Sequence, residues 1–180
     1  MTVRATGLAV LCVLAAACAP FRPGQPGESA SREMPTVAHQ GEGAVLARDA
    51  LALIGTPYRF GGSDPSVGLD CSGLVTYIHG RLGIAVPRTA AAQFAAARPV
   101  DRTAVQPGDL VFFRLVPGSR EVTHVGVYLG AGRFVHAPQT GRSVEAASLG
   151  DSYFSARYAG AGRFYPDSAG AGPRAETPNQ

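Results

Sequence analysis

The sequence predicts an α+β fold in which N-terminal helices pack on an antiparallel sheet of about five strands. Segments with a helical spacing of apolar residues come first in the folded region, and short strand-like runs separated by turns follow them. The chain has 180 residues, 46% of them hydrophobic, which suits one compact domain with tails. We place that domain at residues 41–165.

Three helices are expected ahead of the strands, at residues 42–54, 71–82 and 89–97. The first carries an apolar stripe and ends at Gly55-Thr56-Pro57. The second follows a loop rich in glycine, has apolar residues at helical spacing and stops near Gly83. The third is rich in alanine.

The strands are expected in the second half of the domain, at residues 109–115, 123–129, 133–137, 142–147 and 157–165. Gly130-Ala131-Gly132 is interpreted as a three-residue hairpin loop. With such a loop, Leu129 pairs with Arg133 and Tyr128 pairs with Phe134. Consecutive strands joined by short turns favour antiparallel pairing.

The charge pattern argues against nucleic-acid binding. All 16 basic residues are arginine, the formal net charge is +3, and the arginines are spread along the chain without a run. A nucleic-acid footprint needs a basic cluster on one element. A mildly basic protein remains compatible with an acidic polymer as substrate.

The N-terminus has the pattern of an export signal at residues 1–17. Arg4 precedes an apolar run, Gly7 to Ala17, that is too short to span a bilayer. Small residues then lead directly to Cys18, which resembles the acylated cysteine of bacterial lipoproteins, and Ala19 resembles a signal for the outer membrane. The alternative is an ordinary cleaved signal with an incidental cysteine.

Two further segments lack the apolar residues of a core. Residues 18–40 are rich in proline, glycine, serine and charge, and we expect a flexible, lipid-anchored tether there. Residues 166–180 have the same character and are expected to be a disordered tail.

Cys71 is the thiol that remains for chemistry. Of three cysteines, Cys12 leaves with the signal and Cys18 would carry lipid. Asp70 can cap the helix that Cys71 opens, and the unpaired N–H groups and positive dipole end of a helix lower a cysteine pKa. The same amides could hold an oxyanion. The alternative is a small, buried and inert cysteine.

Two of the four histidines can supply a base. His39 lies in the tether, and His79 is expected to be a surface or half-buried residue of the helix at 71–82. In the predicted hairpin, His136 pairs with Gly126, one diagonal step from His124. Both imidazoles then point to the same face of the sheet. A helix-terminal cysteine with two such histidines fits a nucleophile, a base and an orienting group.

Two other interpretations of these residues stay open at this point. Cysteine and two histidines could bind zinc, but no CxxC or HExxH spacing occurs, so we expect no metal. Each histidine taken alone would be expected to have a structural role.

Several motifs, in order and without a large insertion, resemble the NlpC-like cell-wall cysteine peptidases. They cover nearly all of the folded segment. They are Thr56-Pro57-Tyr58-Arg59-Phe60-Gly61-Gly62, Gly68-Leu69-Asp70-Cys71-Ser72-Gly73-Leu74-Val75, Pro87-Arg88-Thr89 with Gln93, Gln106-Pro107-Gly108-Asp109-Leu110-Val111-Phe112-Phe113, His124-Val125-Gly126-Val127-Tyr128 and Gly132-Arg133-Phe134-Val135-His136-Ala137.

The resemblance implies a papain-like core and a Cys-His-His triad. By this resemblance Cys71 attacks, His124 is the general base and acid, and His136 orients His124. Tyr58 matches a tyrosine that helps the oxyanion. The remaining two matches are less direct: Asp70 and Ser72 match positions that hold the free amine of a stem peptide in some relatives. Arg88 could meet a substrate carboxylate or cap the following helix.

The resemblance also implies a function and a location. The expected activity is a peptidoglycan endopeptidase that needs no cofactor and cuts an amide bond in a murein stem or crosslink. The anchor at Cys18 would place it on the periplasmic face of the envelope, at the outer membrane, with an unidentified regulator as a further partner. The alternatives are an amidase or acyltransferase on the same fold, a non-catalytic wall-binding lipoprotein, and a secreted, phage-like wall hydrolase.

Overall fold

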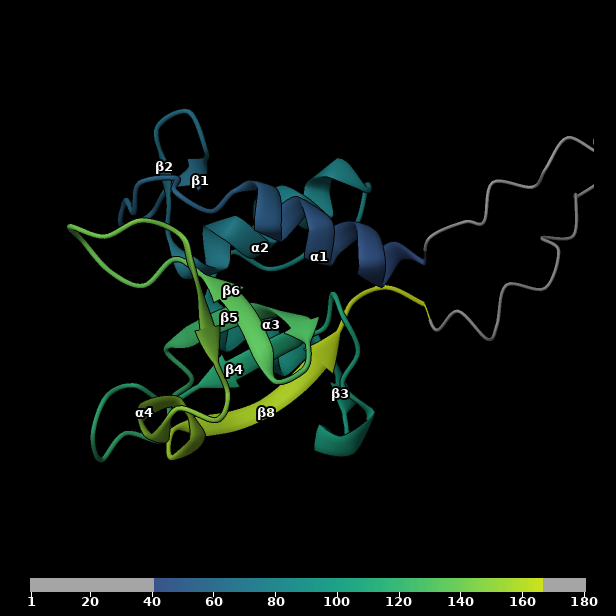
Figure 1. Ribbon diagram of the computed structural model, residues 1–180, viewed down its shortest axis with the longest axis vertical. Coiled ribbons are helices and arrows are strands. Elements are labelled where there is room, and N and C mark those ends of the chain that lie inside the picture. The colour runs from purple at the N-terminus through teal and green to yellow at the C-terminus, as the bar shows by residue number, and fades with distance from the viewer. Residues whose placement is uncertain (1–40, 167–180) are drawn as a thin grey trace, which may run out of the picture. The chain divides into compact units, whose positions relative to one another are not determined.

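A computed structural model describes residues 41–166, which form an α+β fold (Figure 1). The helices are α1 (Glu42–Ala52), α2 (Cys71–Arg81), α3 (Ala90–Ala96), α4 (Ser152–Ser155) and a 3-10 helix, η1 (Arg102–Ala104). The strands are β1 (Ser63–Asp64), β2 (Gly68–Leu69), β3 (Arg98–Val100), β4 (Leu110–Phe113), β5 (His124–Gly130), β6 (Arg133–His136), β7 (Glu145–Ser148) and β8 (Tyr158–Arg163). The predicted fold class is confirmed.

The main sheet has six strands in the order β3-β8-β4-β5-β6-β7, and its neighbouring strands are antiparallel. The prediction of about five strands missed β3, an edge strand that contains Pro99. Proline cannot donate to the ladder and argues against a strand in sequence. The two-residue strands β1 and β2 lie in the segment that was interpreted as a loop. Helices η1 and α4 were also missed, because each is about one turn long.

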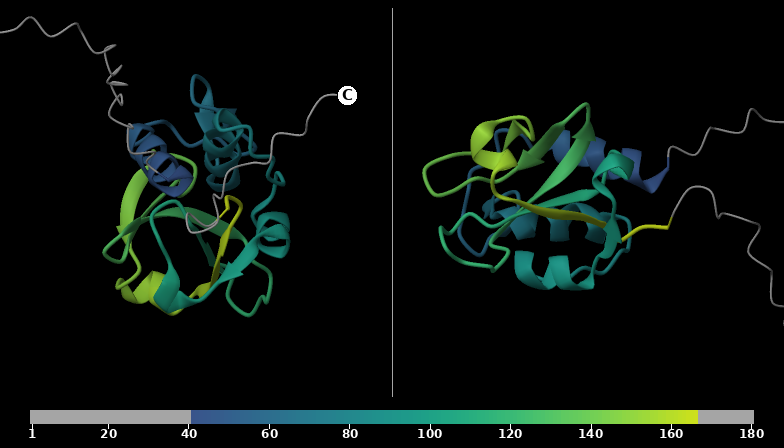
Figure 2. Two further views of the ribbon diagram at one scale, coloured as in Figure 1. Left: turned by 90° about the vertical axis from the view of Figure 1, so that its right-hand side faces the viewer. Right: turned by 90° about the horizontal axis from the view of Figure 1, so that it is seen from below.

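The alternation of side chains along the strands separates two hydrophobic clusters. In β4, Leu110 and Phe112 join a large cluster that includes residues of α1 and α2. Val111 and Phe113 join a smaller cluster with Phe154 of α4. Figure 1 accordingly shows α1 and α2 on one side of the sheet and α4 on the other, and Figure 2 gives two further views of this arrangement. The central strand β5 contacts α1, α2 and α3.

A buried ion pair joins the start of β4 to the end of β8. Arg163 donates from Nε and Nη2 to the carboxylate of Asp109, at 2.5 and 2.8 Å. The Tyr165 hydroxyl and the Gln106 backbone N–H also donate to that carboxylate, at 2.8 and 2.7 Å. Asp109 is 0% exposed. Each of its carboxylate oxygens therefore accepts two hydrogen bonds, as a buried charge requires.

Several predicted segments lie outside the described residues: the signal at 1–17, the tether at 18–40 with Cys18 and His39, and the tail from residue 167 onward. Within residues 41–166, none of the helices is long and apolar enough to cross a membrane.

Candidate active site

Cys71 is the first residue of α2, and Asp70 caps that helix. The Asp70 carboxylate accepts the backbone N–H of Gly73 at 2.6 Å. This contact confirms the predicted cap and satisfies one of the N–H groups that a helix leaves unpaired at its N-terminus. The cap fixes the direction in which α2 begins and therefore fixes the position of the cysteine.

The glycine-rich loop before α2 packs directly on its first turn. The Gly61 N–H donates to Asp70 Oδ2 at 2.9 Å, and the Asp70 N–H donates to the Gly62 carbonyl at 3.0 Å. A Cβ added to Gly73 would collide with the Gly62 carbonyl oxygen. This close approach requires glycine at this position.

The Cys71 thiol lies beside the start of β5, where the backbone N–H of Val125 donates to it. Burial raises the pKa of this thiol, the negative charge of Asp70 raises it further, and the amides of Val125, Ser72 and Cys71 itself lower it only in part. The expected lowering of the Cys71 pKa is therefore wrong. The helix terminus does favour the thiolate, but the capping carboxylate and the loss of water outweigh it.

The two predicted histidines lie together. His124 opens β5 and His136 closes β6, and His124 Nε2 lies 2.8 Å from His136 Nδ1 in a hydrogen bond. Each histidine is 3% exposed. Their rings meet edge to face with centroids 5.0 Å apart. The prediction that both imidazoles point to one face of the sheet is confirmed.

The hairpin that carries the histidines has a different loop from the predicted one. Tyr128 pairs with Phe134 as expected, but Gly130, rather than Leu129, pairs with Arg133, with an irregularity between Tyr128 and Gly130. Ala131 and Gly132 have φ of 49° and 72° and make a two-residue loop. The bulge restores the register before the strand reaches the histidines, so the error at the loop does not change their placement.

Burial keeps both imidazoles neutral. Burial, with a smaller contribution from the neighbouring His136, lowers the pKa of His124 to about 3. Burial also lowers the pKa of His136 to about 4, against a smaller opposing effect of Glu145. At neutral pH the site therefore holds a neutral thiol and two neutral imidazoles. Within residues 41–166, no cluster of three or more His, Cys, Asp or Glu side chains has the arrangement of a metal site.

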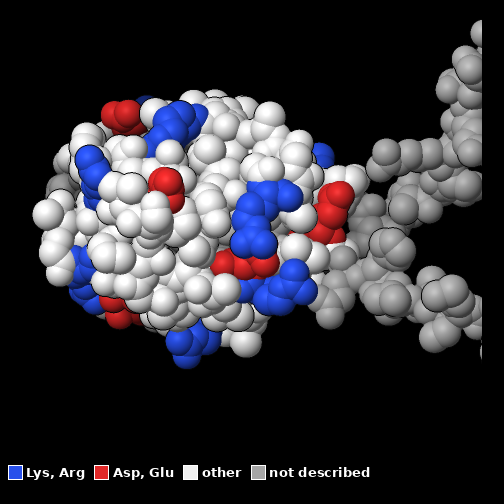
Figure 3. Space-filling view, turned by 90° about the horizontal axis from the view of Figure 1, so that it is seen from above, with Lys and Arg blue, Asp and Glu red and all other residues white. Residues whose placement is uncertain are grey.

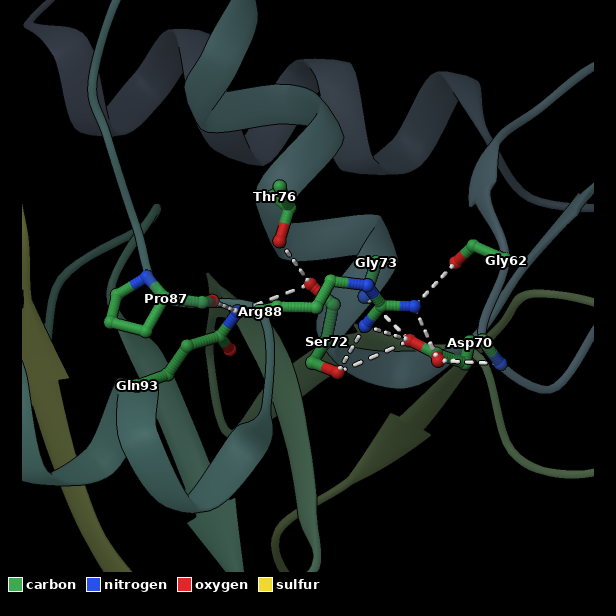
Figure 4. A network of polar contacts seen from close by, with 9 residues as sticks. Gly62, Asp70, Ser72, Gly73, Thr76, Pro87, Arg88 and Gln93 are labelled. Atoms are coloured by element: carbon green, nitrogen blue, oxygen red, sulfur yellow. Dashed lines mark hydrogen bonds and ion pairs between the residues drawn. The ribbon is translucent and has the colours of Figure 1, made fainter.

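Arg88 holds the two predicted substrate-binding side chains (Figure 4). Its guanidinium donates to both carboxylate oxygens of Asp70, at 3.0 and 2.7 Å, and to Ser72 Oγ at 2.9 Å. Arg88 lowers the pKa of Asp70 against the effect of burial. The alternative in which Arg88 caps the next helix is wrong, because the Thr89 side chain is that cap.

An open cleft of about 540 Å³ lies in front of Cys71. Tyr58, Asp70, Ser72 and Arg88 help to line it, as do residues 121–123 just before β5. Burial raises the pKa of Tyr58, as do the nearby Cys71 and Asp70, so its hydroxyl keeps its proton. The structure thus brings Tyr58 and the predicted substrate-binding residues to the same cleft as Cys71.

Acidic and basic side chains are interspersed on the face shown in Figure 3 rather than gathered by sign.

His79 differs from its prediction. It is 0% exposed, its Nδ1 is 2.9 Å from the Val75 carbonyl oxygen, and burial lowers its pKa to about 4. His79 lies on the buried side of α2, which the sequence alone did not indicate.

One residue and one cavity near the site were not predicted from the sequence. Glu145 on β7 pairs across the strands with His136, and a second cavity of about 240 Å³ lies beside both histidines. Leu115, Arg142, Glu145, Tyr153 and Phe154 help to line it. No local motif marks Glu145, because its position depends on the register of β6 with β7.

Comparison with known proteins agrees with this geometry. The NlpC/P60 family pattern matches residues 55–163. The chain is 46% identical over 122 residues to the murein DD-endopeptidase MepH of Escherichia coli K12, a match that covers 66% of this chain and 45% of MepH. It is 40% identical over 120 residues to the gamma-DL-glutamyl hydrolase of Bacillus subtilis 168, covering 66% of this chain and 29% of that protein. The chain thus spans less than half the length of these relatives.

Solved structures are similar as well. The crystal structure of an NlpC/P60 family protein from Bacillus cereus ATCC 10987 matches with a TM-score of 0.65 and 35% identity, over 69% of this chain and 40% of that one. The NlpC/P60 domain of the peptidoglycan hydrolase SagA matches with a TM-score of 0.58 and 34% identity, over 67% of this chain and 97% of that one. With the family pattern covering most of the described residues, this chain belongs to the NlpC/P60 family.

Proposed function

We propose that this protein is a peptidoglycan endopeptidase that hydrolyses an amide bond of murein stem peptides or crosslinks, with Cys71 as nucleophile, His124 as general base and acid, and His136 as the group that orients His124. Two observations carry the proposal: the imidazoles of His124 and His136 are hydrogen-bonded to each other, and the backbone amide of Val125, the residue after His124, acts on the thiol of Cys71 at the start of α2. The family and the activities in the names of MepH and SagA support it.

The thiol and both imidazoles are neutral in the resting site, so the thiol proton leaves as attack begins. Because His124 Nε2 is bonded to His136, the proton from Cys71 goes to Nδ1 of His124. The sulfur forms a bond to the amide carbon, and the carbonyl electron pair moves to oxygen. His124 then returns the proton to the leaving nitrogen as the C–N bond breaks, and water hydrolyses the thioester.

The negative charge that develops on oxygen needs donors that are already in place. Backbone N–H groups at the start of α2 and the protonated Tyr58 hydroxyl, which lines the same cleft, are suited to this role. Asp70 and Ser72, which line the same cleft, are suited to a substrate amine. There Arg88 balances the Asp70 charge, so an incoming ammonium would share the carboxylate with a guanidinium.

The expected location is part of the proposal. The export pattern at residues 1–17 and Cys18 support a chain anchored by lipid at the periplasmic face of the outer membrane, beside its substrate. A Cys18→Ser variant should then leave the membrane fraction. Unchanged partitioning would exclude the lipid anchor and leave the peptidase proposal untouched.

The activity is tested by incubating purified murein with the chain and with Cys71→Ala, and by identifying the products by mass spectrometry. We expect new peptide fragments with the first protein only, and their masses show which bond is cut. Intact murein with both proteins would refute the peptidase, and release of glycan-free intact stems would indicate an amidase.

A further inference from the structure

His136 has one ring nitrogen that the triad leaves unused. Its Nδ1 is bonded to His124, but among the described residues its buried Nε2 makes no hydrogen bond. A buried polar atom without a partner is costly, so a nearby group of opposite polarity matters to it. This nitrogen lies 3.7 Å from Oε1 of Glu145, and both residues line the second cavity.

Glu145 is held in this position from two sides. Its backbone pairs directly with His136 across β6 and β7. Its other carboxylate oxygen, Oε2, accepts a hydrogen bond from Arg142 Nη2 at 2.5 Å. The Glu145 side chain is 34% exposed. Arg142 and the strand register thus present Oε1 to His136.

The position of one proton decides whether His124 can act as a base. If His136 carries its hydrogen on Nε2, its Nδ1 accepts a hydrogen bond and His124 must donate from its own Nε2. Nδ1 of His124 is then an acceptor for the thiol proton. If His136 carries its hydrogen on Nδ1 instead, His124 Nε2 becomes the acceptor and its Nδ1 already holds a proton. The second arrangement cannot take a proton from Cys71.

We propose that Glu145 is a positioning residue: its carboxylate holds the hydrogen of His136 on Nε2, and through the pair of imidazoles this keeps Nδ1 of His124 unprotonated to receive the proton of Cys71. This inference rests on the proposed function of Cys71 and His124. It extends the triad by a fourth group, which acts through two rings.

Among the described residues that line the cavity beside His136, Glu145 is the only carboxylate. Phe134 and Phe154 contact the ring with centroids 5.1 and 5.3 Å away and carry no acceptor in the side chain. Arg142 and Tyr153 also line the cavity, and Arg142 is paired with Glu145. Among the charged groups that influence His136, Glu145 favours its protonated form and Arg142 opposes it. Glu145 is thus the one carboxylate of the described residues that is placed to select the tautomer.

The sharpest variant is Glu145→Gln, because Arg142 determines how the new amide turns. The guanidinium needs an acceptor, so the amide oxygen faces Arg142 and the amide NH2 faces Nε2 of His136. A donor at that place favours the inactive tautomer. Glu145→Ala offers neither donor nor acceptor. A role in packing alone would make the isosteric glutamine the milder change, whereas tautomer selection makes it the more severe.

The first measurement is the nitrogen NMR spectrum of both histidines in the free protein, which distinguishes protonated from unprotonated ring nitrogens. We expect hydrogen on Nε2 of both rings in the natural chain, and on Nδ1 of His136 in Glu145→Gln. The matched control is Glu42→Gln, an exposed glutamate in the first turn of α1, which should leave the spectrum unchanged. The same tautomers in the natural chain and in Glu145→Gln would overturn the proposal.

The second measurement is murein cleavage. We expect Glu145→Gln to lower kcat by about 10- to 100-fold with KM unchanged, less than the roughly 10⁴-fold loss when a carboxylate that contacts the base directly is replaced by its amide. Glu145→Ala should lose less, and Glu42→Gln nothing. If the natural chain leaves murein intact, the proposed function fails, while the spectra still decide whether Glu145 sets the tautomer. Full activity of Glu145→Gln would overturn the positioning role.

Discussion

Two buried polar clusters at strand ends of the same sheet differ in how completely their hydrogen bonds are made. At the start of β4, Asp109 receives four hydrogen bonds from Arg163, Tyr165 and Gln106. At the start of β5, His124 and His136 share one hydrogen bond, and Nε2 of His136 has none among the described residues. Both clusters are buried from water.

The difference indicates what each cluster does. A fully bonded buried ion pair ties two strands together and has no spare donor or acceptor for chemistry. An imidazole pair with incomplete hydrogen bonding costs stability but keeps ring nitrogens available for proton transfer. We therefore expect changes at Asp109 to affect folding, and changes at His124 to affect reaction rate.

The largest expected effect is on activity at the imidazole pair. Replacing His124 with glutamine keeps a polar side chain that can bond to His136 but removes the base, so murein cleavage should fall by about 10⁶-fold, as when a triad histidine is lost. The thermal midpoint should change by only a few degrees. A variant that keeps a tenth of the activity would show that His124 is not the base.

The next effect is on stability at the bonded cluster. Asp109→Ala leaves the Arg163 cation buried without its carboxylate, which costs about 3–5 kcal/mol of unfolding free energy. Urea denaturation followed by circular dichroism measures this cost. The control is Asp64→Ala, whose exposed carboxylate bonds only to Ser66 nearby, and its midpoint should stay close to that of the natural chain. Equal midpoints for the two variants would contradict a structural role for Asp109.

A separate effect, spread over three residues, follows from the neutral histidines when the pH falls. Burial lowers the pKa values of His79, His124 and His136 to about 4, 3 and 4 in the folded chain. The unfolded chain binds protons near pH 6.5, so stability is fully present above that pH. It then falls toward pH 4, on the order of 1 kcal/mol per pH unit for each histidine.

Urea titrations between pH 7 and pH 4 measure how the free energy of unfolding changes with pH. His79→Gln should reduce that slope by the contribution of one histidine and leave the active site unchanged. A stability that does not change over this range would show that the imidazoles are not held neutral.

The smallest expected effect is at the thiol. Because burial and Asp70 raise the Cys71 pKa, the rate of alkylation by iodoacetamide should rise with a midpoint above about 8.5, the value of an ordinary thiol. The free enzyme then reacts slowly at neutral pH and depends on His124 for its proton transfer. A midpoint well below 8.5 would show an ion pair of thiolate and imidazolium in the resting site.

Local patterns in the sequence were enough for the framework of the site. Asp70 before a helical stripe predicts a cap, and a cap defines where Cys71 stands. Alternation along two strands joined by a short turn places His124 and His136 on one face, although the turn itself was misassigned. Short elements such as β3 and α4 have too few residues to show a period, which explains why they were missed.

The sequence by itself determined the order of the elements, the capped cysteine and the shared face of the two imidazoles, because these depend on neighbours within a few residues. Only the tertiary structure decided the burial of His79 and the direction in which the Cys71 pKa shifts. It also decided the hydrogen bonds from Arg88 to Asp70 and the position of Glu145 next to His136. Those properties depend on the surroundings of each group, and the surroundings are set by segments brought together from distant parts of the chain.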